Sequence, residues 1–330
     1  DFESQTPDAK EKDYKKHKSE YQGEIRIGLG SCCMASGSED IRKSIEQSID
    51  RNKLNIHVKQ VGCVGMCHQV PLVEVIPGNK PAKLYAKVKP EDIDYLVTKH
   101  YYPHSFFQKI KRQIYRRLET IQTDQNWEGL EKYSIDIREA HLNSFLENQV
   151  PIATESRGVL NPMDIEEYIQ LGGFKGLKKA LEYTSEENIE EIRRSGIRGR
   201  GGAGFPTYIK WKLVADQQSN TKYIICNGDD GDPGAFMDRM LLESYPFRII
   251  EGILIAAFAL QATKGFFYIR AEYPLAVETV RLALEKARAS GYLGQNILNS
   301  GFNFDMEIVE GAGAFVCGEE TALIASIQGQ

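Results

Sequence analysis

Three short apolar segments alternate with two longer helical patterns in the second half of the chain. The sequence predicts strands at 223–226, 266–269 and 306–309, and helices at 247–262 and 275–289. Strands that alternate with helices are typical of right-handed βαβ units and a parallel sheet. Ligands of such sheets bind beyond the carboxyl ends of the strands. The loops that follow these three strands are therefore the first candidates for a site.

A smaller α/β pattern occupies residues 24–103. Strands are expected at 25–30, 56–61, 72–76 and 84–88, with a helix at 39–49 after the first strand and a last helix that opens at Lys89-Pro90-Glu91. One cysteine pair, Cys32 and Cys33, follows the first strand, and the other, Cys63 and Cys67, follows the second. If these two strands are neighbours, their loops lie side by side and the four cysteines converge.

Length, composition and charge exclude several classes of protein. A length of 330 residues predicts two or so domains, and a composition of 42% hydrophobic and 26% charged residues is typical of soluble ones. Because the net charge is −5, no nucleic-acid partner is expected. The longest apolar run, 249–260, is interrupted by Glu251 and falls short of the ~18 residues of a spanning helix, so no membrane insertion is expected. Six cysteines are too few for a secreted disulfide scaffold. We expect a cytoplasmic protein.

Two segments lie outside the α/β patterns. Residues 1–23 are rich in Lys, Asp and Glu and predict a flexible charged tail. Residues 104–160 predict a helical connector, because 104–117 are basic and aromatic with helical charge spacing and little glycine. That helix either docks a partner subunit or is a solvated helix that covers its own domain.

A glycine-rich loop follows a predicted helix that begins at the capping box Thr184–Glu187 and stops at Gly196. The loop has four glycines in six residues: Gly199, Gly201, Gly202 and Gly204. A dinucleotide fingerprint should follow a strand, so the usual Rossmann interpretation fails on context. Glycines still allow backbone N–H groups to approach a flat ring or a phosphate, while Arg200 and Lys210 add positive charge. The alternative is a glycine-rich surface turn.

An acidic loop directly follows the strand that ends at Cys226. It carries four oxygen-bearing side chains: Asn227, Asp229, Asp230 and Asp232. They could bind a divalent metal, or accept hydrogen bonds from ribityl hydroxyls and a ring N–H. Calcium is disfavoured, because Met240 stands where a calcium loop carries its twelfth-position Glu. A solvated acidic turn is the alternative.

A third segment, 310–323, again follows a predicted strand and runs into a helix that opens near Gly318. Glu319 and Glu320 suit the positive end of the helix dipole, and they equally suit recognition of sugar hydroxyls and an amide. Cys317 is more typical of a core thiol than of a nucleophile.

These three segments together resemble the flavin-bearing subunit of NADH dehydrogenases of the respiratory complex I type, with its relatives in NAD-linked hydrogenases and formate dehydrogenases. GRGGAGFPTYIKW, NGDDGDPGAFMDR and GAGAFVCGEETAL carry the resemblance, over residues 161–330. It implies a Rossmann-like FMN- and NADH-binding domain. The implied cofactor-binding residues are Gly199, Arg200, Gly201, Gly202, Phe205, Lys210, Asn227, Asp229, Asp230, Asp232, Phe315, Gly318, Glu319 and Glu320.

The resemblance also implies roles. The glycine loop and Lys210 would hold FMN, and Asn227, Asp229 and Asp230 would bind its ribityl chain and ring. Phe205 would stack on the adenine of NADH, and Asp232 and Glu320 would position the nicotinamide.

The sequence departs from this family at several positions. Leu213 replaces a second adenine-stacking Phe, which predicts weaker NADH binding, while Asp230 replaces a Glu and Phe315 replaces a Tyr. The family's [4Fe–4S] segment would lie beyond Gln330. Because Gln330 falls inside a helical pattern, we expect either a fragment or a remainder that is a separate polypeptide.

The N-terminal unit resembles the thioredoxin-like [2Fe–2S] ferredoxin domain. Cys63 and Cys67 fit its second pair. The family separates the first pair by four residues, whereas this chain has adjacent Cys32 and Cys33, and Gly28 stands five positions before Cys33. The four cysteines are the implied cluster ligands. His68 as a substitute ligand and a zinc site are the alternatives.

The function implied is an NADH (NAD+) oxidoreductase module. Hydride would pass between nicotinamide and FMN, and single electrons would pass to iron–sulfur subunits of a larger complex, such as a hydrogenase, a formate dehydrogenase or a complex I-like enzyme. A non-catalytic docking or scaffold subunit is the alternative. A carboxylate-bound metal site of a hydrolase is weaker, because no nucleophile–base pair is evident.

Overall fold

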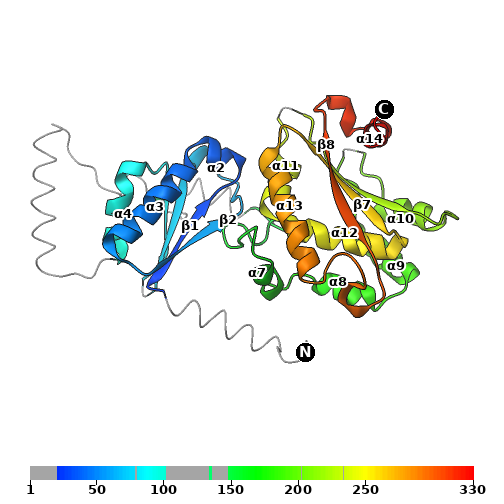
Figure 1. The fold of residues 1–330 in the computed structure, drawn as a ribbon, viewed down its shortest axis with the longest axis horizontal. Helices are drawn as coiled ribbons and strands as arrows, with labels where there is room; N and C mark the ends of the chain where they lie inside the picture. Colours follow the sequence, from blue (N-terminus) through cyan, green and yellow to red (C-terminus); the bar gives the residue numbers. More distant parts are fainter. Residues whose placement is uncertain (1–20, 79, 102–133, 136–147, 202, 233) are drawn as a thin grey trace, which may run out of the picture. The chain divides into compact units, whose positions relative to one another are not determined.

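The computed structural model describes residues 21–78, 80–101, 134–135, 148–201, 203–232 and 234–330. The chain divides into two compact units, residues 1–159 and residues 160–330 (Figure 1). Both units are α/β, as the sequence predicts. None of the helices described is both long and apolar enough to span a bilayer.

Unit 1 is built on a five-stranded sheet with the order β2-β1-β3-β4-β5. β1 and β2 pair in parallel, and the other neighbours pair antiparallel. The strands are β1 (Gly23–Gly28), β2 (Ile56–Val61), β3 (Leu72–Pro77), β4 (Lys83–Ala86) and β5 (Ser134–Ile135). β1 and β2 are neighbours, which meets the condition for convergence of the cysteines, so the two cysteine loops start at the same sheet edge.

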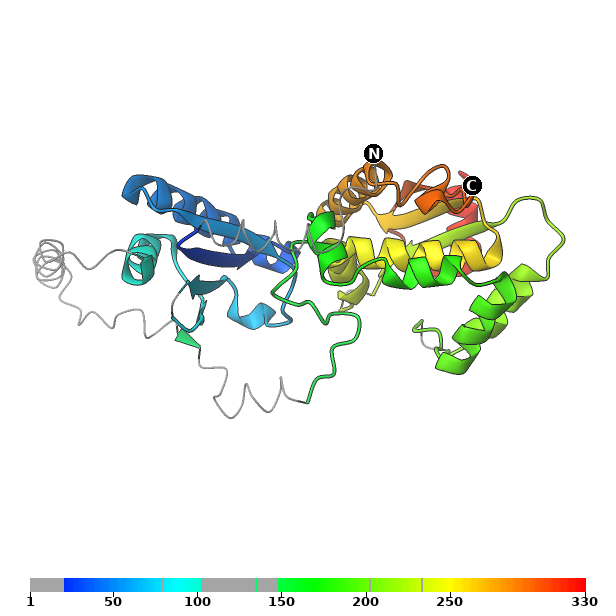
Figure 2. The same cartoon turned by 90° about the horizontal axis from the view of Figure 1, so that it is seen from below.

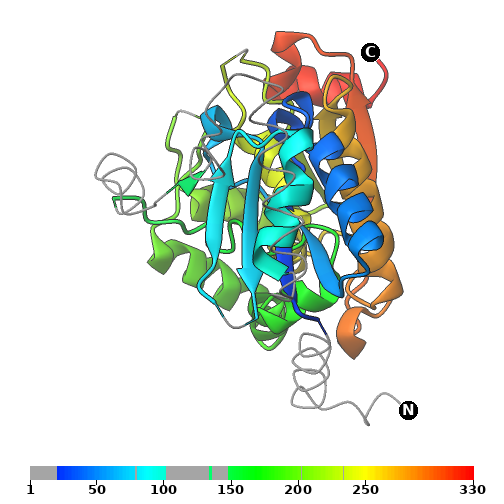
Figure 3. The ribbon, with the colours of Figure 1, turned by 90° about the vertical axis from the view of Figure 1, so that its left-hand side faces the viewer.

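Two helices, α3 (Ser38–Asn52) and α4 (Ile93–Tyr101), pack on each other and on this sheet (Figure 3). Ile25 and Ile27 alternate with charged residues along β1 and are buried, and Ile41 and Ile45 are buried four residues apart on α3. These two spacings are the periods of a strand and of a helix. They place one apolar face of each element in a shared core.

Several short elements complete unit 1. They are α2 (Ser31–Ala35), η1 (Cys67–Gln69) and η2 (Pro90–Asp92). The sequence did not predict α2. Of the expected connector, residues 134–135 form β5 and residues 148–160 form turns, while the basic stretch 104–117 lies outside the described residues. Residues 1–20 of the expected tail also lie outside them.

Unit 2 contains a parallel sheet, as predicted, and its strands lie in the order β6-β7-β8. Its strands are β6 (Tyr223–Gly228), β7 (Lys264–Arg270) and β8 (Asp305–Gly311). The crossover helices α12 (Pro246–Leu260) and α13 (Pro274–Ala289) contact each other and pack on the sheet, and α11 (Met237–Ser244) contacts both.

The remaining helices lie before and after this βαβ core. Figure 2 shows α8 beside α12, and α9 beside α10. The elements are α7 (Ile165–Gln170), α8 (Lys175–Leu181), α9 (Ser185–Ser195), α10 (Thr207–Ala215), η4 (Ile297–Asn299), η5 (Phe315–Gly318) and α14 (Glu320–Ile327).

Helix ends confirm some sequence expectations and correct others. α9 begins with the predicted capping box of Thr184 and Glu187 and ends at Gly196, which is left-handed. The N-terminus of α7 is capped by Asp164, whose side chain accepts a hydrogen bond from the Glu167 N–H. α14 ends at Ile327, so Gln330 does not lie in a helix; Gly329 has a φ of +78°, a conformation typical of helix C-termini.

Candidate functional site

The carboxyl ends of β6, β7 and β8 lie at one edge of the sheet. Gly228 is in register with Ile269, and Arg270 is in register with Gly311. The acidic loop leaves β6 at this edge, and the third segment leaves β8 at the same edge. Segments about ninety residues apart in sequence are therefore neighbours in space.

Hydrogen bonds join these segments directly. The Asn227 side-chain amide donates to the Gly318 carbonyl at 2.9 Å, and its oxygen accepts from the Asp229 N–H at 3.2 Å. The Lys210 ammonium, in the first turns of α10, pairs with the Glu320 carboxylate at the start of α14. The helix that follows the glycine loop thus contacts the third segment, which Asn227 joins to the acidic loop.

Asp229 is the most constrained of these residues. Its side chain is only 1% exposed, and neither carboxylate oxygen has a hydrogen-bond partner among the described residues. A Cβ on Gly231 or on Gly318 would lie 2.7 or 3.2 Å from Oδ2. Burial raises the pKa of this carboxyl above its usual range. A buried acceptor without a donor is costly, so this position fits a ligand that brings N–H or O–H groups.

The glycine loop is closed at its base and open at its tip. The Gly199 N–H donates to the Phe205 carbonyl at 2.8 Å, and the Arg198 guanidinium donates to the Gly204 carbonyl at 2.9 Å. A Cβ on Gly201 would meet no atom within 4 Å. Because protein contacts do not explain a glycine there, the free space fits the close approach of a bound group. Gly202 lies outside the described residues.

Several residues of the predicted site are exposed to solvent. Arg200 and Asp232 are exposed, and Phe205 and Phe315 are large apolar side chains that are 48% and 73% exposed. The Phe315 backbone packs against Gly231, which places Phe315 beside the acidic loop. Leu213, the expected substitute for an aromatic residue, is also exposed on α10.

Two acidic side chains are engaged in local structure. Asp230 has a left-handed backbone with φ +47°, and its carboxylate accepts from the Arg239 N–H at 3.3 Å. The Glu319 carboxylate accepts from the N–H groups of Thr321 and Ala322 and caps α14. These hydrogen bonds hold the pKa of Glu319 below its usual range. Glu319 therefore performs the helix-end role that was one of its two predicted roles.

Sequence reasoning missed the residues that follow β7. Arg270 donates to the Gly313 carbonyl, and the Tyr273 hydroxyl donates to the Asp230 carbonyl at 2.8 Å. Their position in the sequence could have identified them, because Arg270 ends the middle strand of the parallel sheet and Tyr273 follows it, at the edge where ligands of such sheets bind.

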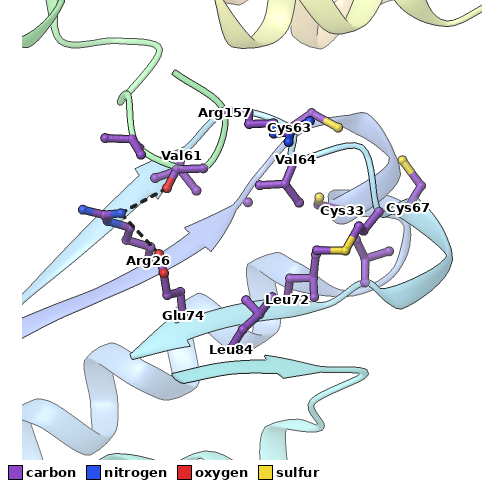
Figure 4. Close-up of a pocket in the computed structure, with 16 residues that line it drawn as sticks. Arg26, Cys33, Val61, Cys63, Val64, Cys67, Leu72, Glu74, Leu84 and Arg157 are labelled. Carbon is purple, nitrogen blue, oxygen red and sulfur yellow. Dashed lines mark hydrogen bonds and ion pairs between the residues drawn. The ribbon is translucent and has the colours of Figure 1, made fainter. Parts of the chain in front are cut away.

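The cysteines of unit 1 meet at a pocket of about 300 Å³. Figure 4 shows the thiols of Cys33, Cys63 and Cys67 at one end of it, beside Val64 and Leu72. Burial, together with the neighbouring thiols, raises the pKa of Cys33 to about 12. Burial also raises the pKa of Cys67, whose thiol is within hydrogen-bond reach of Cys32 and Cys63. The Gly65 N–H donates to the Cys63 sulfur at 3.3 Å.

α2 explains how adjacent cysteines can serve one site. Consecutive residues of a helix point about 100° apart, whereas those of a strand point to opposite faces. Cys33 is buried and Cys32 is exposed at its rim. A Cβ on Gly28 would lie 3.2 Å from the Cys33 sulfur, so Gly28 also borders this space.

The four thiols of Cys32, Cys33, Cys63 and Cys67 match the number of ligands that a two-iron cluster takes. Among the described residues, no group of three or more His, Cys, Asp or Glu side chains is placed to hold a single ion. A [2Fe–2S] cluster needs four thiolates in all, two on each iron. His68, the alternative ligand, is exposed in η1.

Comparison with known proteins gives a family for each unit. Residues 192–330 match the Nuo51 FMN-binding domain, and residues 13–100 match the thioredoxin-like [2Fe–2S] ferredoxin. The NADP-reducing hydrogenase subunit HndC of Solidesulfovibrio fructosivorans is 51% identical over 182 residues, which are 55% of this chain and 37% of that protein. A subunit of the NADH-quinone oxidoreductase of Aquifex aeolicus is 48% identical over 166 residues, 50% of this chain and 39% of that protein.

Among solved structures, a crystal structure of NAD+-reducing [NiFe]-hydrogenase in the air-oxidized state aligns with a TM-score of 0.41 and 23% identity, covering 94% of this chain and 46% of that one. The chain spans less than half the length of these relatives. The two family matches cover the two units separately. The chain therefore joins a thioredoxin-like [2Fe–2S] ferredoxin domain to a Nuo51 FMN-binding domain.

Proposed function

We propose that this chain is the NADH-oxidising (or NAD+-reducing) flavin module of a multi-subunit enzyme. The observation that carries the proposal is Asp229, a buried carboxylate with two unpartnered oxygens among the described residues, at the carboxyl edge of a parallel sheet where the acidic loop meets the third segment. In a domain of the FMN-binding family, a flavin is the ligand that this acceptor fits.

Positive charge and backbone amides would bind the phosphate end of FMN. Lys210 supplies an ammonium at the start of α10, and the open face around Gly201 supplies N–H groups. Gly199, Gly202 and Arg200 belong to the same loop. Lys210 pairs with Glu320 in this structure, so a phosphate competes with that carboxylate for the ammonium.

Acceptors at the other end would bind the ribityl chain and the ring. Asp229 offers two oxygens, and Asn227 and Gly318 are already joined beside it. Asp230 and Phe315 border the same loops. When bound, FMN supplies the exchange between two-electron nicotinamide chemistry and one-electron iron–sulfur chemistry, which no side chain provides.

The exposed residues would bind NADH. Phe205 offers a ring face for the adenine, and the exposed Leu213 offers only an aliphatic contact, which favours weaker binding. Asp232 and Glu320 would orient the nicotinamide, and Glu319 supports Glu320 by capping α14. The role of these side chains is orientation, so no general acid or base is assigned.

The [2Fe–2S] cluster would be held by Cys32, Cys33, Cys63 and Cys67. Thiolates are the ligands that iron–sulfur clusters take, and the amide of Gly65 stabilises negative charge on Cys63. Electron-transfer partners would be iron–sulfur subunits of a larger cytoplasmic complex. Both relatives described above are themselves subunits.

The test is an anaerobic visible spectrum of the purified chain, reconstituted with FMN and iron, before and after NADH. We expect flavin absorbance that bleaches with NADH, and about two irons per chain. Lys210→Met should weaken FMN binding about ten- to a hundredfold, since a charge-assisted hydrogen bond is lost.

Lys212→Met is the matched control, because Lys212 lies on the same helix and pairs with Asp216. It should bind FMN like the wild type. A wild-type chain that takes up no FMN would overturn the proposal and favour the docking or scaffold function.

A further inference from the structure

The end of β7 contacts both loops that flank Asp229. The Arg270 guanidinium donates to the carbonyl of Gly313 in the loop after β8, and it also lies 3.3 Å from the Glu272 carboxylate. The Tyr273 hydroxyl donates to the Asp230 carbonyl in the loop after β6. The acidic loop and the third segment are thus held by one short stretch that contains none of the glycine-rich or acidic motifs.

The fit at Gly313 is tight. Its φ is +82°, and a Cβ there would lie 2.2 Å from Glu272 Oε1. The backbone of this turn therefore rests directly on the Arg270–Glu272 pair. A turn held this closely has little freedom to move unless that pair moves as well.

A neutral donor would be enough to hold a carbonyl, so the charge of Arg270 requires its own explanation. Its side chain is 13% exposed, and its Nε has no hydrogen-bond partner among the described residues. The charged or titratable groups that face Asp229 are Arg270, Glu272, Asp230 and the Tyr268 phenol. Of these, only Arg270 favours the ionised carboxylate.

We propose that Arg270 is a positioning residue of the flavin site, which both fixes the 311–315 loop through Gly313 and keeps the buried Asp229 carboxylate negatively charged as a hydrogen-bond acceptor. The inference rests on the proposed function for its link to FMN. The two effects on the protein itself can be measured without the cofactor. Burial raises the pKa of Asp229, and the nearby positive charge of Arg270 opposes that rise.

The first measurement is hydrogen–deuterium exchange of the flavin-free full chain over residues 311–318, in wild type, Arg270→Gln and Arg270→Lys. Arg270→Gln should speed exchange about tenfold, the factor expected for one lost hydrogen bond, because the glutamine amide ends two bonds short of the guanidinium nitrogen that donates to Gly313. Arg281→Gln is the control, because Arg281 is a half-exposed arginine of α13 that pairs with Glu278. It should exchange like the wild type.

The second measurement is the titration of the Asp229 carboxyl by 13C NMR, with Asp229→Asn used to assign its signal. The midpoint should rise by about one pH unit or more in Arg270→Gln and stay near wild type in Arg270→Lys, because an opposite charge nearby favours the ionised form. A purely structural role for Arg270 would leave this midpoint unchanged.

The third measurement links both effects to the cofactor. FMN affinity, followed by quenching of flavin fluorescence, should fall with Arg270→Gln, and more steeply at low pH than in the wild type. Equal exchange in Arg270→Gln and wild type, or an unchanged Asp229 midpoint, would overturn the inference. A wild-type chain that fails to bind FMN would overturn the proposed function instead, while exchange and titration still decide what Arg270 does.

Discussion

Glu251 is the one acidic residue in α12, and its carboxylate stabilises the start of a different helix. It accepts from the Phe174 N–H at 2.8 Å, from the Leu177 N–H at 3.1 Å and from the Tyr168 hydroxyl at 2.5 Å. α8 has no side-chain cap of its own. Glu251 thus satisfies N–H groups that would otherwise lack partners at the helix end.

Glu251→Gln keeps the volume of the side chain but leaves only one accepting oxygen. We expect the free energy of unfolding to fall by about 1–3 kcal/mol, because a buried donor loses its partner. Urea denaturation measures this. Glu278→Gln, on the exposed face of α13, is the control and should change stability little. Equal stability of both variants would show that the α8 cap is dispensable.

His100 is a second residue whose environment is set by burial. Its Nε2 lies 2.7 Å from the hydroxyl of the buried Tyr85, and burial lowers its pKa from about 6.5 to about 4. Between these values the unfolded chain takes up a proton that the folded chain does not, so stability falls as pH falls from 6.5 to 4. Glu24, whose pKa is lowered to about 2, adds a separate loss below pH 4.5.

Replacing His100 should therefore flatten the pH dependence of unit 1 between pH 6.5 and 4. Pulse proteolysis of the full chain in urea, with survival of unit 1 as the readout, measures it for His100→Gln. His68→Gln, at an exposed position, should keep the wild-type slope. The same slope in all three proteins would mean that another group titrates in this window.

At the scale of elements, the loops of the flavin site are held by hydrogen bonds from neighbouring segments. Tyr273, at the start of α13, fixes the Asp230 carbonyl, and its ring faces the Arg239 guanidinium at 5.1 Å. Asp230 needs such support because its left-handed φ is unfavourable for a residue with a side chain. The loop conformation therefore depends on an element outside it.

Tyr273→Phe removes only the hydroxyl that holds Asp230. We expect FMN affinity to fall about fivefold, in line with the loss of about 1 kcal/mol for one hydrogen bond. Flavin fluorescence titration gives the affinity. Tyr223→Phe is matched in chemistry and lies at the amino end of β6, away from the loops, so it should bind FMN like the wild type. An affinity unchanged in Tyr273→Phe would show that Asp230 holds its conformation unaided.

The same elements show what sequence can and cannot predict here. The three strands of the parallel sheet were predictable because apolar runs mark them, and the α9 capping box because its residues have a fixed spacing. α2 was missed because five residues are too few to show the repeated apolar spacing that marks a helix in a sequence. Arg270 and Tyr273 were missed because their contacts depend on strand order and register, which bring them to loops about forty residues away.

The cysteine site shows the same limit. Spacing alone made adjacent Cys32 and Cys33 hard to reconcile with one cluster, and the helix that turns them toward the second pair removes the difficulty. The convergence of Cys63 and Cys67 with them follows from the parallel pairing of β1 and β2, which the strand pattern left open.

At the scale of the whole molecule, the two candidate cofactor sites belong to separate cores. The core of unit 2 is built from α12, α13 and the parallel sheet, and that of unit 1 from β1, β3, α3 and α4. The flavin-site residues all lie in unit 2, and the four cysteines all lie in unit 1.

Loading of the two sites should therefore be independent in the full chain. Cys33→Ser removes a buried thiol and should abolish the roughly two bound irons while FMN affinity stays within about twofold of wild type. Lys210→Met should weaken FMN binding and leave the iron content unchanged, because sites without shared partners behave additively. Iron assay and flavin titration of both variants and of the double variant measure this. Loss of FMN binding in Cys33→Ser would contradict two independently folded sites and would indicate that assembly of the cluster domain controls the flavin domain.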